Sequence, residues 1–157
     1  MIGIDELKTL IPHRGKMLLL TRVNTYSVKE MRLCAEYDIT PDCVFFDTSV
    51  GGVPSWAGFE FIAQAISVLS GIRYREMGIK PRIGFILSIP SMKMEVPFFR
   101  PGSRIDLRVK QNYATDLIYT FEGEAFLEGK KAVEGKLMVM EIDEENYSNL
   151  CREHQDN

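Results

Sequence analysis

The residues most able to do chemistry lie in a long apolar segment near the middle of the chain. Residues 54–72 read PSWAGFEFIAQAISVLSGI, and Glu60 is the one charged side chain among them. At about 100° per residue, Glu60, Gln64 and Ser67 share one narrow stripe of a helix, with Trp56 at its edge. A carboxylate buried in such a helix is costly unless it is hydrogen-bonded. We therefore predict that Glu60 is held by polar partners and can give or take a proton.

A simpler alternative is that this stripe faces solvent and has no chemical role. A solvent-facing stripe normally collects several charged side chains, whereas this one carries a single glutamate. We therefore favour a buried, functional carboxylate.

Histidines and cysteines are few, which limits the kinds of site that the chain can build. There are two histidines, His13 and His154, and three cysteines, Cys34, Cys43 and Cys151, without metal-type spacing. We therefore expect no zinc or other metal site, no cofactor and reduced thiols. His13 has two interpretations: a loop residue that orders the first strand, or a replacement base that contacts the substrate.

Length and composition favour one domain. The net charge of -3 over 157 residues argues against a dedicated nucleic-acid binder. The apolar segment is about as long as a membrane span, but Glu60 and Gln64 near its middle argue against one. The first residues place acidic side chains before any apolar stretch, unlike a signal peptide, so we expect a cytoplasmic protein. We expect one domain over residues 1–142, followed by an acidic tail over residues 143–157.

The hydrophobic pattern changes along the chain from helical to alternating. It predicts a short amphipathic helix over residues 4–10 and a long helix with Pro54 in its first turn and Gly78 at its end. The simplest way to bury one long apolar helix is to wrap an antiparallel sheet around it, which is an α+β fold with a single-layer sheet. The alternating segments predict strands over residues 17–23, 30–39, 83–87 (resuming at 92–96), 104–110, 117–127 and 131–142.

Three motifs resemble those of the hotdog-fold 3-hydroxyacyl-(acyl-carrier-protein) dehydratases. IPHRGKMLLLTRV is similar to their PHR-x-P-F-L-L-x-D-R-V opening, and VPSWAGFEFIAQAISVLSG to their central helix, which carries E-A-x-A-Q. VPFFRPGSRIDLRV is similar to their F-x-x-P-V-x-P-G-D-x-L segment at the start of a strand. The segments GGVPSWAGFEFIAQAISVLSGIR and RIGFILS resemble a divergent subgroup from aryl polyene clusters, in which V-P-x-W replaces an M-P-G turn.

The resemblance implies a single hotdog fold that pairs with a second hotdog subunit, as a homodimer or a heterodimer. It also implies active sites at the subunit interface and acyl chains delivered on the phosphopantetheine arm of an acidic acyl carrier protein. Glu60 matches the family's helix carboxylate, and Gln64 matches the glutamine one turn later. His13 matches the histidine of the PHR motif, which is not the catalytic one in the family. The catalytic histidine belongs to a G-H-F-P-G loop, whereas the corresponding residues 45–54, FFDTSVGGVP, contain no histidine.

Dehydration of a 3-hydroxyacyl thioester needs a base for the C2 proton, an acid for the leaving hydroxyl and a donor for the thioester oxygen. We expect Glu60 to act as the acid or as acid and base, and His13 is the second catalytic candidate. A backbone N–H just before Pro54 is the expected donor, because proline has none. Trp56 is expected to exclude water from Glu60. The predicted substrate-binding residues are Gly52, Val53, Trp56 and Gln64.

Three functions remain open at the level of sequence. The first, which we favour, is a dehydratase of fatty-acid or aryl-polyene type; in one version of it, the chain is half of a heterodimer whose partner supplies the missing histidine. The second is a hotdog acyl thioesterase in which Glu60 activates water. The third is a non-catalytic partner subunit that binds the acyl carrier and in which Glu60 is structural. A basic cluster has two interpretations, ordinary solvated surface charge or, together with Arg14 and Lys16, a docking surface for the acidic carrier protein: Arg73, Arg75, Lys80 and Arg82.

Overall fold

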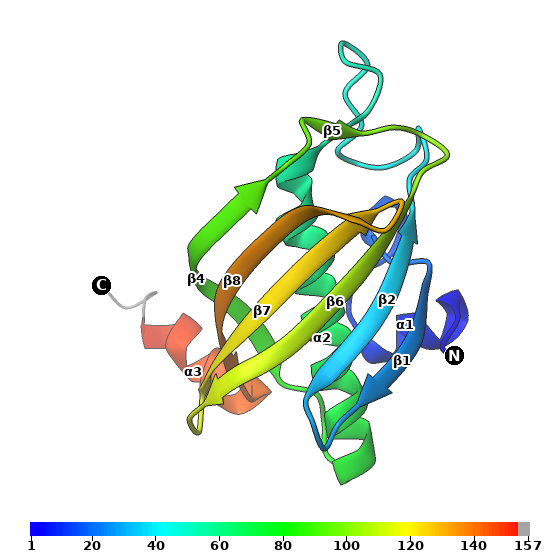
Figure 1. The fold of residues 1–157 in the computed structure, drawn as a ribbon. Helices are drawn as coiled ribbons and strands as arrows, with labels where there is room; N and C mark the ends of the chain where they lie inside the picture. The colour runs from blue at the N-terminus through cyan, green and yellow to red at the C-terminus, as the bar shows by residue number, and fades with distance from the viewer. Residues whose placement is uncertain (154–157) are drawn as a thin grey trace.

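A six-stranded antiparallel sheet forms one layer of the molecule, in the order β1-β2-β6-β7-β8-β4. The computed structural model describes residues 1–153, with side chains through residue 149. Tight turns join β6 to β7 and β7 to β8, so these strands are neighbours both in the chain and in the sheet (Figure 1). The strands are β1 (Arg22–Ser27), β2 (Arg32–Asp38), β4 (Ile83–Met94), β6 (Arg104–Ala114), β7 (Ile118–Leu127) and β8 (Lys130–Ile142).

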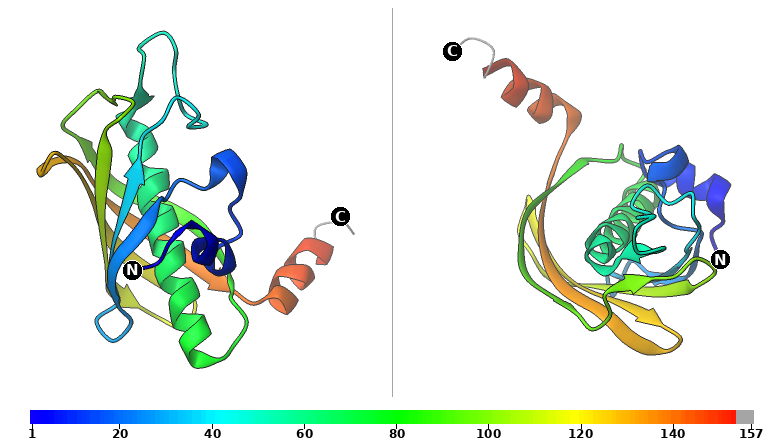
Figure 2. Two further views of the ribbon diagram at one scale, coloured as in Figure 1. Left: turned by 90° about the vertical axis from the view of Figure 1, so that its right-hand side faces the viewer. Right: turned by 90° about the horizontal axis from the view of Figure 1, so that it is seen from above.

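The sheet curves around one long helix, α2 (Gly58–Met77), which runs along its inner face (Figure 2). The buried face of α2 includes Phe61, Ala65 and Leu69, none of which is exposed to solvent. A shorter helix, α1 (Ile4–Leu10), covers a side of α2 that the sheet leaves open (Figure 2). This arrangement confirms the predicted α+β architecture, with an antiparallel sheet wrapped around the central helix.

Two glycines allow the neighbouring elements to approach α2 closely. A Cβ atom at Gly123 in β7 would overlap the side chain of Ile62 in α2. A Cβ atom at Gly71 in α2 would overlap the backbone carbonyl oxygen of Leu10, at the end of α1. The side chain of Ile62 therefore packs directly on the backbone of β7, and the backbone of α2 lies against that of α1, which holds the helix between the two.

The two ends of the long helix differ in how well the sequence predicts them. Gly78 ends α2 in the left-handed region (φ 68°), as predicted, because glycine adopts this conformation without steric cost. Pro54 is not in the first turn of the helix. It lies in the two-residue strand β3 (Val53–Pro54), which pairs with β5 (Phe98–Phe99), and a 3₁₀ turn (Ser55–Ala57) follows before α2 begins at Gly58.

The predicted strand over residues 17–23 is wrong for most of its length. A 3₁₀ turn (Gly15–Met17) occupies its start, and β1 begins only at Arg22. Leu18, Leu19 and Leu20 between them are buried, which explains the strand-like apolar pattern. The backbone N–H of Leu19 is bonded to a side chain of α2 instead of to a neighbouring strand.

The two segments predicted at residues 83–87 and 92–96 form one continuous edge strand, β4. Its register against β8 shifts between Ile86 and Ser91, and Pro90 lies in this irregular stretch. Proline is tolerated here because β4 is the last strand of the sheet and, within residues 1–153, one side of it has no strand neighbour. Exposed apolar side chains on this edge are Ile86, Leu87, Ile89 and Met94.

The predicted acidic tail begins with a helix, α3 (Glu144–Glu153), which projects away from the sheet (Figure 2). The ring of Tyr147 in α3 stacks on Phe85 of β4, with 5.7 Å between the ring centroids. The rest of the predicted tail, including His154, lies outside the described residues. Among the helices of residues 1–153, none has the length and apolar character that a membrane crossing requires.

Candidate active site

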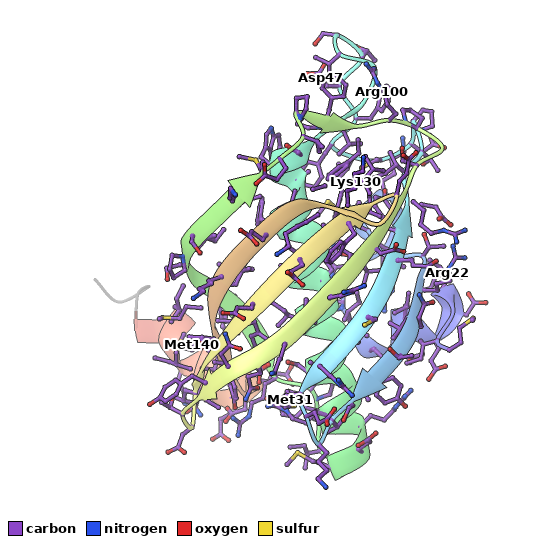
Figure 3. All side chains as sticks on the ribbon, viewed as in Figure 1. Arg22, Met31, Asp47, Arg100, Lys130 and Met140 are labelled. Carbon is purple, nitrogen blue, oxygen red and sulfur yellow. The ribbon has the colours of Figure 1, made fainter. Side chains whose placement is uncertain are left out.

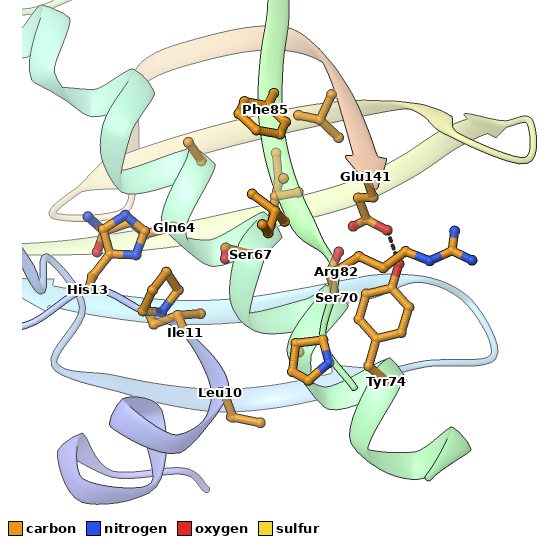
Figure 4. Close-up of a pocket in the computed structure, with 18 of the residues that line it drawn as sticks. Leu10, Ile11, His13, Gln64, Ser67, Ser70, Tyr74, Arg82, Phe85 and Glu141 are labelled. Atoms are coloured by element: carbon orange, nitrogen blue, oxygen red, sulfur yellow. Dashed lines mark hydrogen bonds between the residues drawn. The ribbon is translucent and has the colours of Figure 1, made fainter. Parts of the chain in front are cut away.

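A cavity of about 550 Å³ lies between α1, α2 and the first half of β4. The predicted stripe of α2 forms one wall of it, through Glu60, Gln64 and Ser67. The loop after α1 contributes His13, and β4 contributes Phe85 on the opposite side (Figure 4). The polar stripe deduced from helical periodicity therefore faces a cavity, not bulk solvent.

Glu60 and His13 meet at one end of this cavity. His13 Nε2 lies 3.7 Å from Glu60 Oε1. Their side chains are 28% and 17% exposed, so both are largely withdrawn from water yet reachable from the cavity. Glu60 lies in the first turn of α2. These contacts bring together the two residues predicted to be catalytic.

Gln64 holds Glu60 in place and ties the helix to the N-terminal segment. Its side chain is fully buried. Its Nε2 donates to Glu60 Oε1 and to the backbone carbonyl of Met17, both at 2.8 Å, while its Oε1 accepts from the N–H of Leu19 at 2.8 Å. The amide thus uses donor and acceptor atoms together, which makes Gln64 a positioning residue for Glu60.

Arg14 fixes the loop that carries His13, a role that sequence reasoning missed. Its guanidinium donates to the backbone carbonyls of Lys8 (2.7 Å), Ile11 (2.6 Å) and His13 (2.7 Å). Three charge-assisted hydrogen bonds to one turn of backbone hold the histidine over Glu60. The match of residues 11–14 to a known motif was the one available signal, because a sequence does not reveal bonds from a side chain to backbone carbonyls.

A second polar cluster closes the other end of the cavity. Glu141 of β8 is 4% exposed and accepts hydrogen bonds from the hydroxyl of Tyr74 and from Arg73, both in α2. The guanidinium of Arg73 also lies over the rings of Tyr74 and Tyr119, 4.6 and 4.9 Å from their centroids. Burial and the neighbouring carboxylate of Glu141 raise the pKa of Tyr74, so its hydroxyl stays protonated and donates.

The other predicted substrate-binding residues do not line this cavity within one chain. The N–H of Gly52 donates to the carbonyl of Asp47 at 3.2 Å, and Val53 pairs with Phe99 in the small second sheet. Trp56 is 48% exposed and contacts the ring of Phe45 edge-on, 5.5 Å between centroids. Their role in substrate binding stays a prediction for an assembly with a second subunit.

The loop that lacks the family histidine is nevertheless ordered by specific contacts. Arg100 donates to the carbonyls of Val50 and Gly51, at 2.8 and 3.3 Å, and its guanidinium lies over the ring of Phe98. Asp47 and Arg100 lie together at the end of the molecule beyond the sheet (Figure 3). Val50 and Trp56 leave apolar surface exposed at this end.

The predicted carrier-docking cluster is only partly available. Arg73 is 15% exposed and is committed to Glu141, so its assignment to a docking surface is wrong. Arg75 forms a 2.8 Å ion pair with Glu6. Arg82 is half-buried and lines the cavity. Within residues 1–153, no group of His, Cys, Asp and Glu side chains is arranged to hold a metal ion.

Comparison with known proteins identifies the family. The ApeP-like family, described as ApeP dehydratase, matches residues 5–150. The chain belongs to the ApeP-like dehydratase family. A 3-hydroxyacyl-(acyl-carrier-protein) dehydratase, FabZ, of Erythrobacter litoralis is 30% identical over 143 residues, which cover 89% of this chain and 93% of the relative. The FabZ of Campylobacter hominis is 28% identical over 146 residues, which cover 91% of this chain and 99% of the relative.

Solved structures agree with this family. A chain of the dehydratase heterocomplex ApeI:P from Xenorhabdus doucetiae has a TM-score of 0.83 at 26% identity and covers 92% of this chain and 96% of that chain. A hypothetical thioesterase with coenzyme A from Streptococcus pneumoniae has a TM-score of 0.60 at 6% identity and covers 78% of this chain and 85% of that chain, which shows the fold alone. The resemblance to hotdog-fold dehydratases, with its aryl polyene subgroup, is confirmed.

Proposed function

We propose that this chain is a subunit of a dehydratase that converts 3-hydroxyacyl thioesters, carried on acyl carrier protein, into enoyl thioesters. Membership of the ApeP-like dehydratase family supports the reaction class. The observation that carries the proposal is the placement of Glu60, bonded by Gln64 and facing His13, at one end of a cavity large enough for an acyl chain.

The reaction is an elimination across C2 and C3 of the acyl group. A base takes the proton from C2, the C2–C3 double bond forms, and the C3–O bond breaks as an acid protonates the hydroxyl, which leaves as water. Each positioned acid or base contributes about 10²–10⁴-fold to the rate. We assign protonation of the leaving hydroxyl to Glu60, because its Oε2 is free of the hydrogen bond that Gln64 makes to Oε1.

The base has two candidate sources, and both are histidines. The loop over residues 45–54 has none, so a partner hotdog subunit is the first candidate. The heterocomplex architecture of the ApeI:P relative supports such a partner, as do the exposed apolar side chains on edge strand β4. The second candidate is His13, whose Nε2 faces Glu60 within the same chain. We favour the partner histidine, with His13 as the group that orients Glu60.

Reconstitution separates these candidates. The chain is purified alone and co-expressed with a neighbouring hotdog protein, and each sample is given a 3-hydroxyacyl thioester of acyl carrier protein. We expect enoyl thioester from the complex and little from the single chain. Free thiol in place of enoyl product would show hydrolysis and overturn the proposal.

A His13→Asn variant decides the role of the local histidine. If the partner supplies the base, this variant of the complex keeps product formation within about tenfold, since orientation of Glu60 is weakened but both acid and base remain. Full activity of the single chain, abolished by His13→Asn, would contradict the composite site and make His13 the base.

The same proposal includes the protein that delivers the substrate and the cell compartment in which the enzyme works. The acyl group enters on the phosphopantetheine arm of an acidic carrier, and the enzyme works in the cytoplasm. The free thiols of Cys34 and Cys43 are consistent with a reducing compartment.

A further inference from the structure

Gly84 lines the cavity from the edge strand β4, and it presents backbone in place of a side chain. It pairs with Glu141 of β8, and residues directly opposite each other in an antiparallel pair point to the same face of the sheet. Glu141 is bonded to Tyr74 of α2, so this face is the inner one. A side chain at position 84 would therefore point toward α2 and into the cavity.

The fold of residues 1–153 does not itself require a glycine at position 84. Glycine weakens a strand, and inside one it ordinarily marks a left-handed residue, a bulge or the close approach of another group. Gly84 is not left-handed, and the register of β4 against β8 is unbroken from Ile83 to Ile86. Apart from its two chain neighbours, no heavy atom of these residues would lie within 4 Å of a Cβ atom at Gly84. The space in front of Gly84 is therefore open to a group from outside the chain.

This open space lies at the end of the cavity that is distant from Glu60. Gly84 is the second residue of β4, which follows the C-terminal end of α2, whereas Glu60 lies in the first turn of α2. Ser70 and Tyr74 line the same end, away from His13 (Figure 4). Ser70 comes ten positions after Glu60, which is about 15 Å along a helix. At about 1.2 Å per bond, an extended chain crosses that distance in about twelve bonds.

The path between the two ends suits a hydrocarbon chain. Apolar side chains from three elements line it: Ile66 of α2, Ile86 of β4 and Val139 of β8. Such a lining favours an apolar ligand, because burial of apolar surface on both sides removes it from water. An acyl chain that starts at Glu60 and follows α2 therefore reaches the space in front of Gly84.

We propose that Gly84 is a specificity-determining residue that admits long acyl chains. The inference rests on the proposed function, because it takes the acyl chain to start at Glu60. With no side chain at position 84, the path stays open beyond about twelve bonds from the reacting carbons. A side chain at this position would close the path and shorten the longest chain that fits.

Binding of two acyl-coenzyme A thioesters to the full chain tests this role without turnover. The probes carry saturated chains of about eight and about sixteen carbons, so that only the longer one reaches Gly84. Neither has a 3-hydroxyl, and both are used below their micelle concentrations. Isothermal titration calorimetry gives a Kd for each. We expect the wild type to bind the longer probe at least about tenfold more tightly, which is the effect of burying about two further methylene groups.

Two variants of β4 locate the source of this preference. Gly84→Val should weaken the longer probe by at least about tenfold and leave the shorter one within about threefold. Valine suits a strand better than glycine does, so the unfolding free energy should be no lower than that of the wild type. Ser88→Val is the matched control, because it places the same side chain on an exposed residue of β4 outside the cavity. It should leave both Kd values unchanged.

Four results would overturn the inference. The first is a wild type that binds both probes equally, which would mean that the acyl chain does not enter this end of the cavity. The second is unchanged binding of the longer probe by Gly84→Val, and the third is equal weakening of both probes. The fourth is an equal effect of Ser88→Val. If Gly84→Val keeps both Kd values but no longer assembles with the partner subunit, the second result assigns the open space to that partner. Failure of the proposed function is seen separately, as absence of enoyl product in the reconstituted complex.

Discussion

Replacing Gln64 by leucine tests whether one buried amide holds the active site together. Leucine fills a similar volume but removes all polar atoms from the side chain. Gln64→Leu leaves the N–H of Leu19 unpaired, in a residue that is fully buried, and takes the donor from Glu60 Oε1. The carbonyl of Met17 also loses its partner, but Met17 is exposed and water can replace the bond.

The magnitude follows from these contacts. An unpaired buried N–H costs about 1–3 kcal/mol, and a hydrogen bond to a charged group contributes about 1.5–3 kcal/mol when it is buried. Glu60 is partly reachable by water, and leucine recovers some burial energy, so the net loss of unfolding free energy should be about 2–4 kcal/mol. For a domain of this size, that lowers Tm by about 5–15 °C.

Urea denaturation followed by circular dichroism measures the loss. Ser67→Ala, on the same stripe, is the matched control and should change the unfolding free energy by less than about 0.5 kcal/mol. Hydrogen exchange at Leu19 should accelerate in Gln64→Leu, because its N–H no longer has an acceptor. Unchanged unfolding free energy together with unchanged exchange at Leu19 would refute the reasoning.

Three further substitutions test the framework around the site. Gly71→Ala forces the backbone of Leu10 away from α2 and should lower the unfolding free energy by about 1–3 kcal/mol. Urea titration measures this loss, and an unchanged midpoint of unfolding would contradict the close approach of α1. Gly78→Ala places a side chain on a residue in the left-handed region at the end of α2 and should lower the unfolding free energy by about 1 kcal/mol in the same assay. An unchanged unfolding free energy would mean that residue 78 does not adopt the left-handed conformation. The hydrogen bond from Arg22 holds the pKa of Glu36 below its ordinary value of 4.5, so this pair stabilises the fold above about pH 4.5 and less as the pH falls through the lowered pKa. Glu36→Gln should therefore lower stability by about 1–3 kcal/mol at pH 7 and by progressively less below pH 4.5, whereas a loss independent of pH would exclude the carboxylate as the cause.

The polar stripe of α2 could be predicted from the sequence because helical periodicity is a local property. The spacing of Glu60, Gln64 and Ser67 fixes them on one face of a helix whatever the helix packs against. The same argument predicted Gly78 as the end of the helix. His13 and Glu60 could both be named as candidates because each lies in a motif that resembles one of a known family. Their distance of 3.7 Å required the structure.

The remaining contacts depend on chain segments that are far apart in sequence. The side chain of Gln64 in α2 makes the hydrogen bonds to the backbone of Met17 and Leu19 that a neighbouring strand would otherwise make. The apolar pattern of this segment therefore predicted a strand where there is none. Strand alternation places Glu141 on the same face of β8 as the buried Leu137 and Val139, but its partner Tyr74 lies in α2, far away in the sequence. The prediction for Pro54 was wrong because the fixed φ of proline suits a short strand as well as a first helical turn, and the ψ of 138° places Pro54 in the strand.

The most direct test of the central claim is the rate of enoyl thioester formation by a Glu60→Gln variant of the reconstituted complex. Glutamine keeps an oxygen that accepts the hydrogen bond from Gln64, so the fold and the complex should assemble as in the wild type. Without a proton to give, the variant should be at least about 100-fold slower at the same unfolding free energy. A rate within a few-fold of the wild type would contradict Glu60 as the proton donor and leave it a structural residue.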